Sequence, residues 1–364
     1  MIHTDVIIVG GGPAGLCAAY SLVKQGVSVT LFERNSKLGG QLVKQTHKFF
    51  GSEKQYAKTR GFDIAAKLIK DLEPYSAFLT IEKNATVLGI YPDKVVTVMK
   101  NEAYFKYQCK AIIVSTGAME KVLAFEQNDL PGIYGAGAVQ TLMNVYGVYP
   151  GQSIVMVGSG NIGLIVSYQL LQAGVEVKAV IEAASSIGGY KVHASKLRRL
   201  GVPILTNTTI KKAHGVDFLT GVETIQLDES WKTIPGTEKT IQCDACCISV
   251  GLAPMHQLLS MAGVHMKYIP EFGGIVPIAS DTHETSYDGL FVAGDVYGIE
   301  EASSAIVEGY LSGLYVSNKL GMKSEEINSQ IADFHQQLEY LRSGPFGKKT
   351  RQGLEKIKEA RNVT

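Results

Sequence analysis

The chain has few residues of the kinds that cross-link, anchor or strongly charge a protein. Its five cysteines are odd in number and irregularly spaced, which argues against a disulfide framework and favours a reducing, cytoplasmic setting. No apolar run reaches the ~18 residues that predict a membrane span. The formal net charge is only +1, so the charge balance does not indicate a nucleic-acid-binding protein. The histidines show no metal-ligand spacing, and we expect no metal site.

Glycine, in contrast, is abundant, and two stretches use it in the same way. Residues 5–15 read DVIIVGGGPAG, and residues 153–163 read SIVMVGSGNIG. Each is an apolar, β-branched run followed by G-x-G-x-x-G and a helical pattern, which is the fingerprint of a βαβ dinucleotide-binding unit. The glycines allow a tight turn and a close approach of backbone to a pyrophosphate, and the helix N-terminus supplies N–H groups to the anion. Two such units predict two nucleotides and redox transfer between them.

The periodicity of the rest of the chain predicts an α/β fold. Apolar residues at helical spacing predict helices, and short buried or alternating runs predict strands. The expected helices are 14–25, 61–72, 162–172, 192–200 and 302–320, with a charged helical segment at 324–364. The expected strands are 6–9, 27–32, 86–91, 94–99, 111–116, 175–181, 204–206, 221–227 and 240–250.

An acidic residue follows the second strand of each unit. Glu33 lies 18 residues after Gly15, where its carboxylate would accept hydrogen bonds from the hydroxyls of an adenosine ribose. In the second unit, counting from the glycine before the strand puts Ile181 at the equivalent position and Glu182 one residue later. Glu182 therefore either reaches a ribose from the turn or is an ordinary exposed glutamate. The second site accordingly binds NAD, binds another adenine nucleotide, or is an empty structural domain.

Further motifs follow in order: Gly39-Gly40-Gln41, Ser115-Thr116-Gly117 and Ala293-Gly294-Asp295. With the first fingerprint and Glu33, they resemble the FAD/NAD(P)-dependent pyridine nucleotide oxidoreductases of the thioredoxin reductase type over about residues 5–320. The resemblance implies two Rossmann-like dinucleotide-binding domains of three layers, the second inserted into the first. The expected FAD-binding domain is 1–121 and 251–323, the NAD(P)-binding domain is 122–250, and the helical C-terminal segment is 324–364.

The same resemblance implies the nucleotide-binding residues. Asp295 would hydrogen-bond the ribityl or pyrophosphate region of FAD, and Gly40 and Gln41 would line the flavin. His47 and Lys48 are the polar residues expected nearest to the isoalloxazine, with a plain surface loop as the alternative, and catalytic residues stay unassigned. The expected FAD set is Gly10, Gly12, Pro13, Ala14, Gly15, Glu33, Arg34, Gly40, Gln41, Val87, Thr116, Gly117, Gly294, Asp295 and Ala302. The expected NAD set is Gly158, Gly160, Asn161, Ile162, Gly163, Glu182 and Gly251.

NAD(H) is favoured over NADP(H) because residues 183–186, Ala-Ala-Ser-Ser, offer no arginine for a 2′-phosphate.

The cysteines depart from the thioredoxin reductase pattern. That family has its redox Cys-x-x-Cys just before the second fingerprint, whereas residues 135–144 contain no cysteine, so disulfide reductase chemistry is not expected. Cys243-Asp-Ala-Cys246-Cys247 lies in an expected strand, where Cys243 and Cys246 would point to opposite faces. Packing in the core is favoured over a redox or metal role for these thiols.

A closer resemblance starts at Ser115-Thr-Gly-Ala-Met-Glu120 and runs through Leu130-Pro-Gly-Ile133 and residues 135–141 into the second fingerprint. This block looks like the flavin/NAD subunits of dehydrogenase complexes that oxidise sarcosine, opines, proline, glycine or glycerol phosphate. It implies an oligomeric assembly in which this subunit transfers electrons between NAD(H) and FAD and a partner subunit oxidises the substrate. Residues 248–364 hold no cysteine, so any iron–sulfur centre would belong to a partner. The alternatives are a stand-alone NADH oxidase or flavin-dependent reductase, and a non-catalytic nucleotide-bound scaffold.

The C-terminal segment carries two signals of its own. Its apolar residues alternate spacings of four and three, which predicts one apolar seam along a helix: Ile327, Ile331, Phe334, Leu338 and Leu341. The seam either docks on the body of the chain or meets a partner. The basic stretch 342–351 is a second candidate for a docking surface.

Overall fold

The computed structural model describes residues 1–362, and the chain divides into two compact units. Unit 1 combines Met1–Met119 with Ala253–Thr364, and unit 2 is Glu120–Leu252. The chain leaves unit 1 along β9 (Ala118–Glu120) and returns along β18 (Leu252–Pro254). Unit 2 is therefore inserted into unit 1. Residues 363 and 364, the end of the predicted segment 324–364, lie outside the described part of the chain.

A parallel five-stranded sheet forms the centre of unit 1. Its strands are arranged in the order β21-β8-β2-β3-β4, and every neighbouring pair is parallel. Their bounds are β2 (Val6–Val9), β3 (Val29–Glu33), β4 (Leu79–Lys83), β8 (Ala111–Val114) and β21 (Leu290–Val292). Such a sheet needs cover on both faces, because its strands β2, β8 and β21 are apolar and buried throughout.

The two faces of this sheet have different covers. Val6 and Ile8 of β2 share a core with α1 (Pro13–Val23), α2 (Gly61–Lys70) and α7 (Ala302–Lys319). Ile7 and Val9 point the other way and pack against a second sheet. That sheet has the order β1-β7-β6-β5, with β1 (Ile2–His3), β5 (Ala85–Ile90), β6 (Val95–Lys100) and β7 (Ala103–Gln108). Unit 1 thus has three layers.

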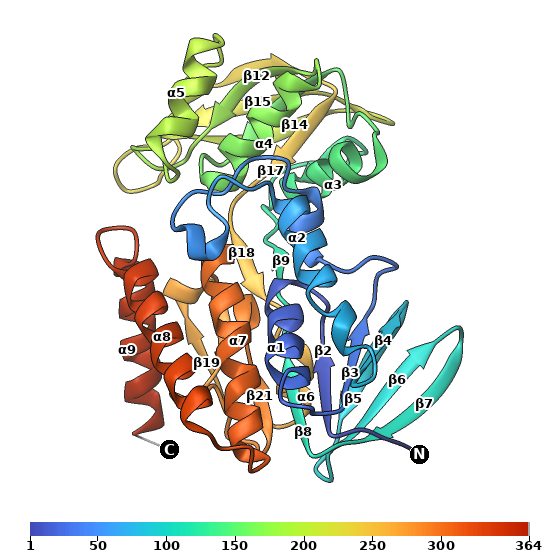
Figure 1. Ribbon diagram of the computed structural model, residues 1–364. Coiled ribbons are helices and arrows are strands. Elements are labelled where there is room, and N and C mark those ends of the chain that lie inside the picture. Colours follow the sequence, from blue (N-terminus) through green and yellow to red (C-terminus); the bar gives the residue numbers. More distant parts are fainter. Residues whose placement is uncertain (363–364) are drawn as a thin grey trace. The chain divides into compact units, whose positions relative to one another are not determined.

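The C-terminal segment is two helices, α8 (Glu325–Arg342) and α9 (Lys348–Arg361), and both belong to unit 1. The predicted seam lies along α8 and packs on α7, with Leu338 in one core cluster with Val307 and Leu311. The ring of Phe334 stacks on Tyr310 at 5.0 Å between centroids. Figure 1 shows α7, α8 and α9 side by side. The seam therefore docks on the chain's own body.

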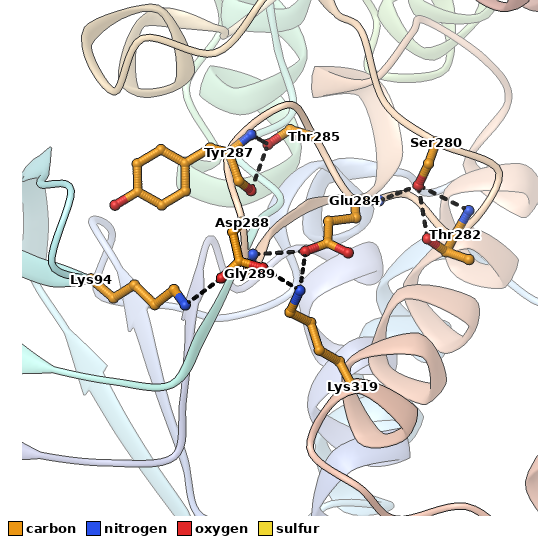
Figure 2. Close-up of polar contacts among 9 residues, drawn as sticks. All are labelled: Lys94, Ser280, Thr282, Glu284, Thr285, Tyr287, Asp288, Gly289 and Lys319. Carbon is orange, nitrogen blue, oxygen red and sulfur yellow. Dashed lines mark hydrogen bonds and ion pairs between the residues drawn. The ribbon is translucent and has the colours of Figure 1, made fainter. Parts of the chain in front are cut away.

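An ion-pair network fixes the loop that leads into β21 (Figure 2). Lys319, the last residue of α7, pairs with Glu284 and Asp288, each at 2.6 Å, and Asp288 also pairs with Lys94 at 2.8 Å. The N–H of Gly289 donates to Glu284 at 2.7 Å. The start of β21 is therefore tied to the end of α7.

The remaining α-helix and strands of unit 1 are α6 (Gln257–Met261), β19 (Met266–Ile269) and β20 (Gly274–Pro277).

Unit 2 repeats the three-layer plan. Its parallel sheet has the order β10-β17-β11-β12-β13, with α3 (Ala136–Tyr146), α4 (Asn161–Gln172) and α5 (Lys191–Arg199) packed on one face. An antiparallel sheet, β14-β15-β16, covers the other face. The strand bounds are β10 (Ile133–Gly135), β11 (Ser153–Val157), β12 (Glu176–Ile181), β13 (Ile204–Leu205), β14 (Thr208–Gly215), β15 (Leu219–Gln226), β16 (Lys239–Gln242) and β17 (Ala245–Ile248).

The predicted α/β class is confirmed, and one predicted strand is wrong. The run 240–250 is two strands in different sheets, β16 and β17, linked by Cys243 and Asp244. The carboxylate of Asp244 accepts hydrogen bonds from the N–H groups of Gln152 and Ser153, each at 2.8 Å, and these bonds hold the link. All other predicted helix and strand ends, up to residue 320, lie within two residues of those observed. Among the helices of residues 1–362, none is long and apolar enough to cross a membrane.

Candidate functional site

The turn between β2 and α1 has the shape that an anion requires. Gly10 has a φ of +112°, and a Cβ there would collide with the carbonyl oxygen of Ser115. Gly12 is the N-cap of α1, and a Cβ there would meet nothing closer than the Cα of Gly40, at 3.8 Å. Within the described chain, no side chain caps this helix. The first N–H groups of α1 therefore border an open cradle that fits a pyrophosphate.

Glu33 closes one side of this cradle. The side chain is buried, with 6% of its surface exposed, and one carboxylate oxygen accepts from the N–H of Gly11 at 2.9 Å. The other oxygen accepts from the backbone and side-chain nitrogens of Asn35, at 2.8 and 2.7 Å. The oxygen that accepts from Gly11 keeps one lone pair for a ribose hydroxyl, and these contacts orient the carboxylate before any ligand arrives.

The other expected FAD residues of unit 1 gather mainly at one edge of its parallel sheet. The carboxyl ends of parallel strands meet at the same edge, which is where ligands bind in such folds. Pro13, Ala14 and Gly15 follow β2, Arg34 follows β3, Thr116 and Gly117 follow β8, Gly294 and Asp295 follow β21, and Ala302 begins α7. Gln41 lies with Gly40 in the turn Gly40–Lys44.

The side chains of two expected FAD residues make contacts within the protein instead. The hydroxyl of Thr116 donates to the carbonyl of Met255 at 2.8 Å, so it holds a neighbouring loop. Val87 lies opposite Val98 in the antiparallel sheet with its side chain in the core, which leaves only its backbone for a nucleotide.

Asp295 is half-buried in the segment that follows β21. Burial raises the pKa of its carboxyl to about 7, and the nearby carboxylates of Glu300 and Glu301 act in the same direction. A hydrogen bond from the backbone of Glu300 acts in the opposite direction. A hydroxyl donor placed beside this carboxyl would stabilise its ionised form and lower its pKa.

The structure does not assign a role to His47 or Lys48. The ring of His47 stacks on Phe49 at 5.6 Å between centroids, and the backbone of Lys48 pairs with that of Arg60 in an isolated antiparallel β-bridge. Both residues belong to the loop between the Gly40–Lys44 turn and α2.

The turn between β11 and α4 repeats the first cradle. Gly158 has a φ of +101°, and a Cβ there would collide with the carbonyl oxygen of Ser249. Its N–H donates to the carbonyl of Ile181 at 2.7 Å, as the N–H of Gly10 donates to Phe32 at 2.8 Å. At Gly160, the N-cap of α4, a Cβ would meet nothing within 4 Å. The second cradle is therefore as open as the first.

The prediction that Ile181 holds the position of the acid is wrong. Val157 is paired with Ile181, as Val9 is paired with Phe32, so Glu182 follows the paired residue just as Glu33 does. The register shifts between Ile154 and Val155, where β12 carries one extra residue, Lys178. This bulge absorbs the extra residue that separates the two halves in the sequence.

Glu182 accordingly makes the same two backbone contacts as Glu33. One oxygen accepts from the N–H of Ser159 at 2.9 Å and from its hydroxyl at 2.5 Å. The other accepts from the N–H of Ala184 at 2.9 Å. Glu182 is thus oriented at the second cradle rather than being an ordinary exposed glutamate.

A second repeated glycine pair was missed from the sequence. The N–H of Gly189 donates to the carbonyl of Ser159 at 2.8 Å, as the N–H of Gly39 donates to Gly11 at 2.8 Å. A Cβ at Gly188 would meet only the edge of the second cradle, at 3.8 Å from Gly160. The signal was available, because Gly39 and Gly188 each lie six residues after the acid.

Three of the remaining expected NAD residues lie in the first turn of α4. Asn161 begins α4, and its side-chain oxygen accepts from the N–H of Tyr190 at 2.9 Å. Ile162 is 36% exposed, whereas Gly163 packs against the carbonyl of Gly158. Gly251 follows β17 and accepts a hydrogen bond from Lys121 at 3.0 Å.

All five cysteines are free and buried. Burial raises the pKa of Cys17, Cys109 and Cys243 to about 12 and that of the remaining two further still. The prediction that Cys243 and Cys246 point to opposite faces of one strand is wrong. Cys243 precedes β17, and both side chains belong to the same core cluster. Among residues 1–362, no group of three His, Cys, Asp or Glu side chains is placed to hold a metal.

The basic stretch 342–351 is only partly a surface. Arg342 is buried against Glu300 and Glu308, and Arg351 donates to the carbonyl of Gly344 at 3.1 Å. Lys348 and Lys349 are exposed. Arg342 of this stretch is therefore paired inside unit 1 and is not part of an exposed basic surface.

Curated relatives match most of this chain. The A subunit of opine oxidase from Agrobacterium tumefaciens is 24% identical over 94% of this chain and 71% of its own length. The HcnB subunit of hydrogen cyanide synthase from Pseudomonas protegens is 25% identical over 88% of this chain and 71% of its own length. The alpha subunit of sarcosine oxidase from Corynebacterium is 26% identical over 88% of this chain, which spans only 33% of that relative. Each of these relatives is named as one subunit of an enzyme.

Solved structures with the same fold include two oxidoreductases. L-proline dehydrogenase of P. horikoshii has a TM-score of 0.71 at 22% identity, covering 91% of this chain and 59% of that chain. Thioredoxin reductase of T. acidophilum has a TM-score of 0.72 at 21% identity, covering 88% and 99%. A family model described as pyridine nucleotide-disulphide oxidoreductase matches residues 4–309. The chain belongs to the pyridine nucleotide-disulphide oxidoreductase family.

Proposed function

We propose that this protein is an FAD-dependent oxidoreductase that transfers hydride or electrons between NAD(H) and FAD as the electron-transfer subunit of a multi-subunit dehydrogenase. The observation that carries the proposal is the repeated carboxylate geometry. Glu33 and Glu182 each hold the second residue of a glycine fingerprint through a backbone N–H at 2.9 Å. Two oriented cradles in one chain suit two dinucleotides that exchange a hydride.

The first cradle is the proposed FAD site. Gly10, Gly12 and the first turn of α1 would bind the pyrophosphate, and Glu33 would bind the adenosine ribose. Asp295 would accept a hydrogen bond from the ribityl chain, with Gly40 and Gln41 beside the flavin. Bound FAD supplies the two-electron chemistry, while the protein positions it and excludes competing reactions.

The second cradle is the proposed NAD site. The carboxylate of Glu182 would accept the ribose hydroxyls of NAD and would repel the 2′-phosphate of NADP. Residues 183–186 supply no positive charge that would counter this repulsion. The register of β12 also removes the main argument for an empty or purely structural second unit, which rested on Ile181.

The proposed electron outlet is a partner protein. Residues 135–144, which form most of α3, hold no cysteine, and the carboxylate of Glu120 accepts from the N–H of Gly137 at 2.6 Å at the start of this helix. The five buried thiols are unsuited to dithiol exchange. Curated relatives are subunits, which supports a partner dehydrogenase or iron–sulfur subunit in an oligomer. Five unpaired cysteines suit the cytoplasm.

Two glycine substitutions test the assignment of the cradles. Gly12 and Gly160 have φ values of −78° and −65°, and a Cβ meets little there, so a valine would fill the cradle without straining the turn. Gly12→Val should abolish retention of FAD while leaving NADH binding, and Gly160→Val should do the reverse, so each variant is the control for the other. Mass spectrometry of released nucleotides and calorimetry with NADH provide the readouts. Wild-type binding of both nucleotides in both variants would exclude the assignment.

Affinity purification of the tagged chain from its native source tests the partner. Co-purification of a dehydrogenase or iron–sulfur subunit in fixed ratio is the expected result. Rapid NADH turnover with oxygen by the chain alone would instead favour a stand-alone oxidase.

A further inference from the structure

A cluster of one arginine and two glutamates, all largely buried, lies where α8 ends. The guanidinium of Arg342 is bidentate to Glu300, at 2.7 and 3.0 Å, and also pairs with Glu308 at 2.5 Å. The side chains of Arg342, Glu300 and Glu308 are only 13%, 9% and 4% exposed. Arg342 therefore lies inside unit 1, in contact with two carboxylates from the chain on either side of the start of α7.

The two carboxylates lead to the two ends of one short segment. The second oxygen of Glu308 accepts from the N–H of Gly294 at 2.9 Å. Glu300 lies at the other end, and its backbone hydrogen-bonds the carboxylate of Asp295. One guanidinium thus holds the segment 294–300 at both ends, through Glu308 at Gly294 and directly at Glu300.

Docking of α8 does not account for this cluster. The helix is already held by its apolar seam, including the stack of Phe334 on Tyr310. Burial of an arginine and two carboxylates is costly, and apolar residues of similar size often serve stability as well. The cluster is better explained by what it holds in place, since Gly294 and Asp295 are the proposed contacts to FAD.

We infer that Arg342 is a positioning residue for the flavin site, which fixes the segment 294–300 through Glu308 and Glu300 and so prepares Gly294 and Asp295 for FAD. The inference rests on the proposed FAD site. It gives the C-terminal helix a role in cofactor binding, although the helix lies outside the two fingerprints.

The same helix also contacts a second segment of unit 1. Asp333 pairs with Lys54 at 2.8 Å, and the side chains of Gln337 and Gln55 are hydrogen-bonded to each other. Gln55 is buried, with 3% of its surface exposed. This segment continues the loop that holds His47 and Lys48, so α8 also contacts the chain between the Gly40–Lys44 turn and α2.

Variants of Arg342 and of Glu308 test the inference. Arg342→Met removes the guanidinium, and Glu308→Met removes the acceptor for the N–H of Gly294. Glu308→Gln keeps an oxygen acceptor there and serves as the conservative rescue. Arg361→Met is the matched control, because Arg361 pairs with the largely exposed Asp281 at 2.7 Å. Far-UV circular dichroism of the full chain establishes that each variant is folded.

Two readouts are needed. FAD affinity of the deflavinated full chain should fall by about tenfold or more in Arg342→Met and Glu308→Met. It should stay within about threefold of wild type in Glu308→Gln and Arg361→Met. Hydrogen exchange in the protein without FAD should accelerate at 294–300 in the two methionine variants and stay unchanged at 6–23.

The outcomes separate the inference from the proposed function. Wild-type affinity and wild-type exchange in either methionine variant that folds would overturn the inference, as would an equal loss in Glu308→Gln and Glu308→Met. Failure of the wild-type chain to bind FAD would overturn the proposed function. The exchange at 294–300 would then still report whether Arg342 orders this segment.

Discussion

The carboxylate of Glu182 accepts the N–H of Ser159 at 2.9 Å, and this contact duplicates the one between Glu33 and Gly11. The duplication depends on a bulge at Lys178, which shifts the register of β12 by one residue. Without that bulge, the acid would point to the opposite face of the strand. The equivalence of the two acids is thus a property of the paired strands rather than of sequence spacing.

Replacement of Glu182 by alanine should weaken NADH binding by roughly tenfold to a hundredfold, because hydrogen bonds to a charged group are worth about 1.5–3 kcal/mol each. NADPH should lose less, since the repulsion of its 2′-phosphate disappears. Calorimetric titration of each nucleotide into the holoprotein measures both effects. Glu176→Ala, an exposed glutamate on the same strand, is the control. Unchanged NADH affinity in Glu182→Ala would remove Glu182 from the proposed site.

Asp295→Asn should weaken FAD binding by about tenfold and make it less dependent on pH. Burial raises the pKa of Asp295 to about 7, and a hydroxyl donor on bound FAD favours the ionised form and lowers that pKa. Wild-type affinity should therefore decrease as the pH falls below about 7. Fluorescence titrations of FAD across the pH range provide the measurement. An equally steep pH dependence in Asp295→Asn would assign that titration to another group.

His283→Asn should reduce the acid sensitivity of the fold. Burial lowers the pKa of His283 to about 3, and Nδ1 lies 2.8 Å from the hydroxyl of Ser312. Below about pH 6.5 the unfolded chain binds a proton that the folded chain does not, so stability is present above that pH and is lost as the pH falls toward 3. Between about pH 7 and pH 5 this amounts to roughly 2 kcal/mol. Asparagine suits the positive φ of this residue, +61°.

The measurement is the denaturant midpoint of wild type and His283→Asn at both pH values. A loss of stability that is equal in the two proteins would show that other groups control the acid response.

The native protein should resist thiol reagents. All five cysteines are buried, and burial raises their pKa values far above neutrality, so thiolate is scarce. Brief maleimide treatment followed by mass spectrometry should detect no adduct on the folded chain and five after denaturation. Rapid labelling of Cys243 or Cys246 in the folded chain would reopen a redox role for this pair.

Most of the fold was predictable because both halves follow a strict pattern. Apolar strands, glycine turns and amphipathic helices are local signals, and the seam of α8 was read correctly from spacings of four and three. The run 240–250 was misread because two strands of different sheets adjoin in it without a turn signal. Its apolar residues are continuous in sequence but belong to different layers.

The site was less predictable where it depends on partners distant in sequence. The first fingerprint and Glu33 are local features. The register of Glu182 depends on a bulge, which side-chain spacing does not reveal. The role of Arg342 depends on carboxylates 34 and 42 residues away, so the sequence showed only a basic stretch.

Anaerobic titration of the purified holoprotein with NADH tests the central claim most directly. The account predicts that the visible absorbance of bound oxidised flavin disappears as NADH is added, and that NADPH is much less effective. The change should be lost in Gly160→Val, which retains its FAD but lacks an open second cradle. A bound flavin that stays oxidised in excess NADH and NADPH would contradict the account.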